Sequence, residues 1–331
     1  MSTRDLAALP KGHLHIHLEA AMRPATLTEL AAAMGVDLPE TTGFTDFTAF
    51  ADMYRGLLAV LRAPANLERL IDEAVADAAA DGVVYIEFGV SPDFHADTYG
   101  SAEAALDAHL AAAAAAGRAH GVEVGLMVTI DRTLGIEPAI ALAELAASRA
   151  GRGVVSLGLA NEERGNPAAD FAEAFAIARA AGLQVAPHAG ELVGPESVWQ
   201  AVEVLHADRV LHGVRAVEDP ALVATLAERG ICLDVCPTSN VLLEVVDDLA
   251  VHPLPQLLDA GVRCSINADD PILFGPGVLD EYLAARTRIG LTDEQLAACA
   301  WSSIETTLAS AETKARAKAG IDAWLGLEVA A

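Results

Sequence analysis

Residues 9–20 read LPKGHLHIHLEA, with three histidines spaced two residues apart. His13, His15 and His17 alternate with apolar residues, and Glu19 follows in the same rhythm. Successive side chains of a β-strand point to opposite faces. The spacing therefore predicts a strand that carries three imidazoles and a carboxylate on one face and apolar side chains on the other.

Seven further short, β-branched runs follow, separated by longer runs of Ala, Leu and Glu with helical periodicity. Parallel strands need helical crossovers, so eight such units in one series favour a (β/α)8 TIM barrel. Two doubly wound sheets are less consistent with the chain, because no linker or change of composition divides it. We expect one domain over residues 1–331, with a helical insertion after the first strand, about residues 20–80, that caps the barrel mouth. The expected strands are residues 13–18, 83–90, 122–130, 153–160, 183–189, 209–214, 231–237 and 262–268.

The charge of the chain excludes some classes of partner. Its 331 residues include 47 acidic and 21 basic ones, a formal net charge of −26. Phosphate binding needs a basic surface, so we expect no nucleic-acid partner and no anionic membrane partner. The N-terminal residues lack the apolar core of a secretory signal, and no apolar run is long enough to span a bilayer. Four cysteines without a CxxC pair favour a reduced, cytoplasmic protein.

Polar residues gather where the predicted strands end, which is where barrel enzymes build their sites. His15, His17, His188 and Asp269 form a set of three nitrogens and one oxygen that suits zinc and leaves room for a bound water. A single inward histidine is usually a hydrogen-bonded core residue. Four candidate ligands at the same end of one barrel instead indicate a metal site.

The number of lysines bears on the number of metal ions. Barrel hydrolases with two metals usually bridge them with a modified lysine on the fourth strand. This chain has three lysines, Lys11, Lys314 and Lys318, and none lies on a predicted inner strand. We therefore expect one Zn2+ per chain, which would lower the pKa of a bound water from about 15.7 to about 7.

The chain contains five motifs in this order: HxH (15–17), HAGE (188–191), LHG (211–213), CPTSN (236–240) and DDP (269–271). Together they resemble the motifs of the adenosine deaminase family, over about residues 9–310. The resemblance implies hydrolytic attack at C6 of a 6-aminopurine with release of ammonia. It implies that Glu191 handles the proton at ring N1, and that His212 orients the water and assists its deprotonation. Asp269 would bind zinc and hold the water, and Asp270 would contact N7.

The chain departs from the adenosine enzymes of the family on the side expected to hold the ribose. Glu19 replaces an Asp that contacts a sugar hydroxyl, and Asn161 replaces a Gly whose backbone meets purine N3. Gly89 stands where an Arg is common, and residues 241–246 read VLLEVV instead of beginning with Gln-Thr. We expect Glu19, Asn161 and Asp270 to contact the substrate. His13 precedes the two ligands at a variable position, where we expect a supporting residue or a filler of the barrel bottom.

The first functional hypothesis is zinc-dependent deamination of adenosine or 2′-deoxyadenosine, which gives inosine and ammonia in the case of adenosine. The same chemistry on 6-aminodeoxyfutalosine or another 5′-modified adenosine comes second, and free adenine third. Two other classes stay open. A zinc amidohydrolase that opens a cyclic amide or ester would release no ammonia, and a non-catalytic barrel would be expected to have lost a ligand or the acid. Deaminases of nucleic-acid bases use a PCxxC segment, which this sequence lacks.

Overall fold

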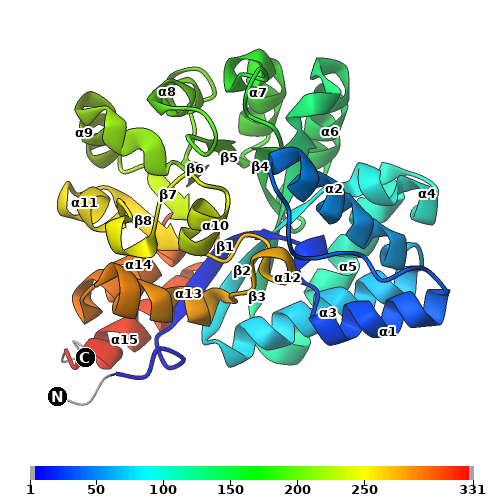
Figure 1. Cartoon of the computed structure of the whole chain (residues 1–331), viewed down its shortest axis with the longest axis horizontal. Helices are drawn as coiled ribbons and strands as arrows, with labels where there is room; N and C mark the ends of the chain where they lie inside the picture. The colour runs from blue at the N-terminus through cyan, green and yellow to red at the C-terminus, as the bar shows by residue number, and fades with distance from the viewer. Residues whose placement is uncertain (1–3, 328–331) are drawn as a thin grey trace.

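Eight parallel strands form a nearly closed barrel surrounded by helices (Figure 1). The structure, a computed structural model, describes residues 4–327. Each strand pairs with the next in chain order, so the (β/α)8 TIM barrel is confirmed. The prediction that residues 1–331 make one domain stays a prediction. The strands are β1 (Lys11–His17), β2 (Val83–Val90), β3 (Glu123–Asp131), β4 (Val154–Ala160), β5 (Gln184–Ala189), β6 (Arg209–His212), β7 (Cys232–Val235) and β8 (Arg263–Ile266).

The first strand differs from its prediction at both ends. It begins two residues earlier, at Lys11, and it ends at His17. Leu18 has helical backbone angles, φ −57° and ψ −48°, and Glu19 opens the short 3-10 helix η1 (Glu19–Ala21). The alternation of the strand therefore stops before Glu19, whose side chain does not share the face of His15 and His17.

Helices cover the outside of the barrel and part of its mouth. The segment after β1 is mostly helical, as the insertion over about residues 20–80 requires. Phe50 in this segment stacks on Phe274, with ring centroids 5.3 Å apart. The α-helices are α1 (Pro24–Met34), α2 (Phe47–Leu57), α3 (Pro64–Ala80), α4 (Ala96–Tyr99), α5 (Ala102–His120), α6 (Ile136–Ser148), α7 (Ala172–Ala180), α8 (Pro195–Glu203), α9 (Pro220–Arg229), α10 (Pro237–Leu242), α11 (Leu254–Asp259), α12 (Pro271–Phe274), α13 (Val278–Ala284), α14 (Asp293–Glu305) and α15 (Ala311–Leu325).

The seam between β8 and β1 is closed largely by residues that follow β8. The Asn267 side-chain oxygen accepts hydrogen bonds from the backbone N–H groups of Leu14 (2.7 Å) and His15 (3.1 Å). The backbone of Asp269 donates to the His15 carbonyl (3.0 Å) and accepts from the His17 N–H (3.1 Å). Closing the barrel therefore fixes Asp269 beside the two histidines.

His13 belongs to the same seam. Its Nε2 accepts a hydrogen bond from the backbone N–H of Ala268 at 3.2 Å, and its side chain is buried. Burial, with a further contribution from His15, lowers the pKa of His13 to about 3, so the imidazole is neutral and can accept. The first of the three histidines thus supports the wall of the barrel.

A buried layer of charged and polar side chains lies inside the barrel below the strand ends. The Arg209 guanidinium pairs with Glu87 and, at 2.7 Å, with Asp234, and all three side chains are fully buried. Ser156 donates to Glu87 (2.6 Å) and Ser265 to Asp234 (2.7 Å). Buried charges persist only when they are paired and hydrogen-bonded, and this layer meets both requirements.

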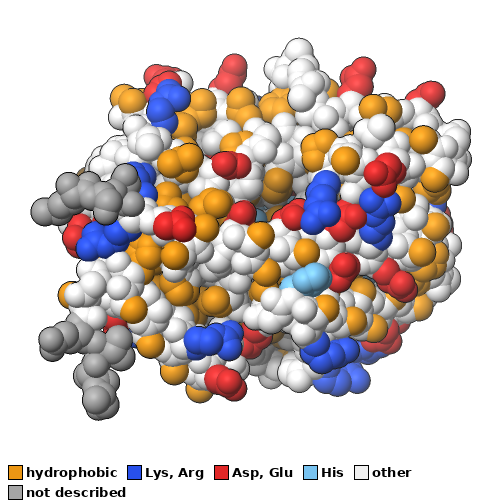
Figure 2. Space-filling model, turned by 90° about the horizontal axis from the view of Figure 1, so that it is seen from below, with side chains coloured by type: hydrophobic (Ala, Val, Ile, Leu, Met, Phe, Trp, Pro, Cys, Tyr) orange, Lys and Arg blue, Asp and Glu red, His pale blue; other side chains and the backbone are white. Residues whose placement is uncertain are grey.

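Charged side chains are dispersed over the face of the molecule in Figure 2. Lys and Arg side chains stand there beside Asp and Glu side chains and form no broad basic surface. Within residues 4–327, no helix combines the length and apolar character that crossing a membrane requires.

Candidate active site

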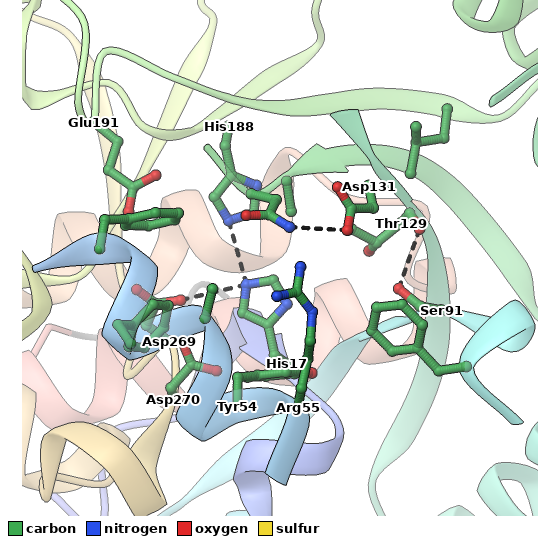
Figure 3. Close-up of a pocket in the computed structure, with 17 residues that line it drawn as sticks. His17, Tyr54, Arg55, Ser91, Thr129, Asp131, His188, Glu191, Asp269 and Asp270 are labelled. Carbon is green, nitrogen blue, oxygen red and sulfur yellow. Dashed lines mark hydrogen bonds and ion pairs between the residues drawn. The ribbon is translucent and has the colours of Figure 1, made fainter. Parts of the chain in front are cut away.

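The strand ends bring four predicted ligands together in the barrel mouth (Figure 3). His15 Nε2 lies 3.1 Å from His188 Nε2 and 3.1 Å from Asp269 Oδ1. His17 Nε2 lies 3.3 Å and 3.4 Å from the same two atoms. Two donor atoms bound at about 2.1 Å to one zinc ion lie about 3 to 3.5 Å apart. These four separations match those of neighbouring donor atoms around one ion.

The protonation states of three of the four side chains also suit a metal. Burial lowers the pKa of His17 to about 4 and that of His188 well below its usual value, so both imidazoles are neutral. His15 Nδ1 lies 3.1 Å from the Asp234 carbonyl, to which it donates, so Nε2 is the atom that faces the other ligands. Burial would lower the pKa of His15, but Asp269 raises it above its usual value, so a metal at Nε2 would displace a proton. Burial alone would raise the pKa of Asp269, but His15 and its neighbouring histidines lower it well below the usual range.

His212 offers an alternative to His17 in the ligand set. His15, His188, His212 and Asp269 carry ligand atoms that all lie within 4.8 Å of one another. The choice between His17 and His212 depends on which ring nitrogen of His212 carries a proton, because a protonated nitrogen cannot bind a metal.

A chain of hydrogen bonds fixes the tautomer of His212. The backbone N–H of Leu254 donates to His252 Nδ1 (3.1 Å), and burial lowers the pKa of His252 to about 4. The single proton of His252 is therefore on Nε2, which donates to Asn240 Oδ1 (3.2 Å). The Asn240 amide must then donate to His212 Nδ1 (3.1 Å).

It follows that neutral His212 carries its proton on Nε2, the nitrogen that faces the ligand cluster. Burial first, and His15 second, lower the pKa of His212 to about 3, so the ring is neutral. His212 Nε2 lies 3.4 Å from Glu191 Oε1 and has no hydrogen-bond partner among the described residues. His212 is therefore a hydrogen-bond donor toward the site, and the set with His17 is the better one for a metal.

Two further predicted residues, Glu191 and Asp270, lie in the same cavity (Figure 3). Both side chains are buried. Burial raises the pKa of Glu191 well above its usual range, and the Asp269 and Glu163 carboxylates raise it further. Burial also raises the pKa of Asp270, with Asp269 and Glu191 adding to the effect. A carboxyl group that stays protonated near neutral pH can give a proton to a ligand.

The pocket extends away from the ligand cluster toward the end of β3. In Figure 3, Asp269, Asp270 and Glu191 lie on one side of His17 and His188, and Asp131 lies on the other. Residues of α2 form one wall. The pocket is lined by His17, Phe47, Phe50, Ala51, Tyr54, Arg55, Ser91, Phe94, Thr129, Ile130, Asp131, Ala160, Asn161, His188, Glu191, Asp269 and Asp270.

Asp131 is a lining residue that the sequence reasoning missed. Its carboxylate accepts from the Asn161 amide (2.8 Å) and from the Thr133 hydroxyl (2.6 Å), so its position is fixed. Asn161, a predicted substrate residue, lines the pocket in a left-handed backbone conformation, φ 78°. Asp131 is the last residue of β3, and the rule that barrel sites lie at strand ends would have found it.

Glu19 lies outside the pocket lining, although we expected it to contact the substrate. Its carboxylate accepts from His95 Nε2 (2.7 Å) and from the Tyr54 hydroxyl (2.5 Å). Burial would raise the pKa of Glu19, but these hydrogen bonds lower it to about 2. The side chain therefore ties α2 to the end of β1 and orients Tyr54, which does line the pocket.

The position of Lys11 corrects one premise of the sequence argument. We expected no lysine on an inner strand, but Lys11 is the first residue of β1. Its ammonium group donates to the backbone carbonyls of Leu6 (3.0 Å) and Asp81 (2.5 Å). Because it lies at the opposite end of β1 from His17, it does not reach the ligand cluster.

Comparisons with known proteins place the chain among purine deaminases. The model of the family described as "Adenosine deaminase" matches residues 10–324. A Streptomyces coelicolor protein named "Adenine deaminase" is 37% identical over 95% of this chain and 94% of its own. The crystal structure of an Arthrobacter aurescens adenine deaminase has a TM-score of 0.90 and 31% identity, and it covers 96% of this chain and 99% of its own. A Burkholderia ambifaria amidohydrolase with bound Zn has a TM-score of 0.86 and 30% identity, over 97% and 91% of the two chains.

The assignment of His17 and not His212 to the ligand set can be tested by metal analysis. We expect His17→Ala to lose most of its bound metal after zinc loading and dialysis, because a ligand is removed. His212→Asn should retain the metal, since the hydrogen-bond chain leaves His212 Nε2 protonated. Zinc content per chain, measured by plasma mass spectrometry, distinguishes the two variants, and metal loss in His212→Asn alone would reverse the assignment.

Proposed function

This chain belongs to the adenosine deaminase family, and we propose that it converts free adenine and water into hypoxanthine and ammonia with one zinc ion. Membership makes it a hydrolase that deaminates a 6-aminopurine. The preference for adenine over adenosine and its 5′-modified forms reverses the order that we expected from the sequence. Relatives named adenine deaminase support this reversal, and so does the polar end of the pocket.

The Asp131 carboxylate is the observation that carries the choice of substrate. A purine has its C6 amino group, N1 and N7 toward one end and N3 and N9 toward the other. With Glu191 at N1 and Asp270 at N7, the N3–N9 edge would face Asp131 and Asn161 across the pocket (Figure 3). Free adenine can donate its N9–H to a carboxylate. A nucleoside carries its sugar at N9 and has no proton there, so it would lose this charge-assisted hydrogen bond to Asp131.

The ionisable groups at the end of the pocket near the ligand cluster would carry out the reaction. Protonated Glu191 gives its proton to N1, which makes C6 more electrophilic as the water oxygen attacks it. Neutral His212 donates a hydrogen bond from Nε2 and so orients the water. Since that nitrogen already carries a proton, we assign the water proton to the Asp269 carboxylate. Asp269 can then return the proton to the amino nitrogen, which leaves as ammonia. As the C6 carbonyl forms, the C6 hydroxyl loses its remaining proton, and that proton restores protonated Glu191.

The donor set supports one zinc ion. His15, His17, His188 and Asp269 would hold it, with Asp234 and Asn240 fixing the ring orientations of His15 and His212. A further group of possible ligands, His17, Asp269 and Asp270, shares His17 and Asp269 with the set proposed here, and shares Asp269 with the group that contains His212. Two separate ions would therefore compete for the same side chains.

A substrate panel tests the proposed function. We expect zinc-loaded protein to release ammonia from adenine with a kcat/KM at least about 10²-fold above that for adenosine, because only adenine can donate an N9–H hydrogen bond to Asp131. Adenosine, 2′-deoxyadenosine, 5′-methylthioadenosine and 6-aminodeoxyfutalosine complete the panel. Faster release from any nucleoside would contradict the choice of adenine. No ammonia from any 6-aminopurine would contradict the reaction.

The role of Asp131 in substrate recognition can be tested by comparing its substitution with that of another carboxylate, Glu162. We expect Asp131→Asn to lower kcat/KM for adenine about 10- to 100-fold, because the new amide presents a donor where the purine also donates. Glu162→Gln is the matched control, since Glu162 pairs with the exposed Arg164 and is absent from the pocket lining. Equal losses in the two variants would remove Asp131 from substrate recognition.

Glu191 should act as an acid. We expect Glu191→Gln to keep one zinc per chain while kcat falls about 10²- to 10⁴-fold, because the amide cannot transfer a proton to N1. In the unmodified protein, activity should fall as the pH rises through the raised pKa of Glu191, since the protonated form is required. A near-normal kcat in Glu191→Gln would exclude this role.

A further inference from the structure

Glu163 follows β4, but all of its side-chain hydrogen bonds go to the loop after β5 and to the start of α8. Its Oε1 accepts from the backbone N–H of Gly190 at 2.8 Å. Its Oε2 accepts from the N–H groups of Glu191 (3.2 Å), Leu192 (2.7 Å) and Val193 (2.8 Å). The Ser197 hydroxyl of α8 donates to Oε1 as well.

Four consecutive backbone donors on one carboxylate make an unusual arrangement. Glu163 is buried, so these groups replace the water that would otherwise solvate its charge. Successive N–H groups that converge in this way form a concave binding site for an anion. Here the anion is a side chain from the neighbouring strand, and the loop of residues 190–193 is wrapped around it.

The backbone of the loop is shaped for this contact. Gly190 has a left-handed conformation, φ 66°, and a Cβ atom there would lie 2.4 Å from Val198. Arg132 holds the backbone just before the loop, because its Nη2 donates to the His188 carbonyl in β5 at 2.6 Å. With Glu163 bound to residues 190–193 and Arg132 bound to His188, the backbone at Glu191 has little freedom to shift.

The same loop places the group that we propose as the acid. The Glu191 backbone is bound to Glu163, and the Glu191 side chain points back into the pocket, where its Oε1 lies 3.4 Å from His212 Nε2. Proton transfer to a ring nitrogen requires heavy atoms about 2.6–3.2 Å apart. A displacement of about 1 Å in such a group can cost about 10²-fold in rate.

We propose that Glu163 is a positioning residue, whose carboxylate holds the backbone of residues 190–193 so that Glu191 meets N1 of the substrate. This inference rests on the proposed function for the role of Glu191. Glu163 itself is absent from the pocket lining, so it acts through the loop.

The first test measures the loop directly and does not depend on any substrate. In Glu163→Gln an amide group faces backbone donors that have lost an acceptor, so we expect faster hydrogen–deuterium exchange in peptides that cover residues 190–193. Glu162→Gln removes the adjacent negative charge and should leave that exchange unchanged. Unchanged exchange in Glu163→Gln would overturn the proposal. Should Glu163→Gln fail to fold, Glu163→Asp keeps the charge, withdraws it by one methylene and should give a smaller increase.

The second test uses the substrate that the wild-type protein turns over. We expect Glu163→Gln to lower kcat about 10²-fold, with KM changed only a few-fold and one zinc per chain retained. Ser197→Ala removes the hydroxyl donor, leaves the four backbone donors in place and should have a small effect.

A double-mutant comparison separates positioning from general loss of structure. In a Glu191→Gln background, Glu163→Gln should cause no further loss of kcat, because the group that it positions has already been removed. A second loss of similar size in that background would mean that Glu163 does not act through Glu191, and would overturn the proposal. No turnover in the wild-type protein would instead contradict the proposed function, and the exchange measurement would still decide the role of Glu163.

Discussion

The backbone pairing of Asp269 with β1 is the interaction on which the rest of the molecule depends. Its N–H and carbonyl bond to the carbonyl of His15 and the N–H of His17, on either side of the isolated bridge to Ile16. This pairing completes the seam of the barrel, and it also sets a carboxylate oxygen 3.1 to 3.4 Å from two imidazoles. Barrel closure and assembly of the ligand cluster are therefore the same structural event, so distortion of one would distort the other.

Around that seam, buried hydrogen bonds determine what each side chain can do. The chain from the Leu254 N–H through His252 and Asn240 gives His212 a donor at Nε2. The Asp234 carbonyl gives His15 the opposite tautomer, with its lone pair on Nε2. In the site that we propose, two histidines of similar burial thus take different roles, one as a ligand and one as a hydrogen-bond donor, because their Nδ1 atoms meet different partners.

Periodicity and strand-end position were enough to predict the eight strands and the residues that gather at their ends. Each predicted strand overlaps an observed one, and β2 agrees to the residue. The prediction for Glu19 did not match, because the backbone turns at Leu18 and alternation cannot anticipate where a strand ends. The sequence did not single out His252, and it assigned no role to the strand-end residue Glu163, for a different reason. Their importance comes from contacts with segments 12 to 30 residues away in the chain, and no local pattern encodes such contacts.

The left-handed backbone at the ends of three even-numbered strands limits how the protein can evolve. Asn161, His212 and Asp269 follow or end β4, β6 and β8 with φ values of 78°, 60° and 61°. Each such residue stores about 1 kcal/mol or more that glycine would release. Selection for thermal stability alone would therefore favour glycine at all three positions and would remove the pocket's side chains in doing so. Contacts elsewhere in the barrel must offset this strain for the fold to be stable.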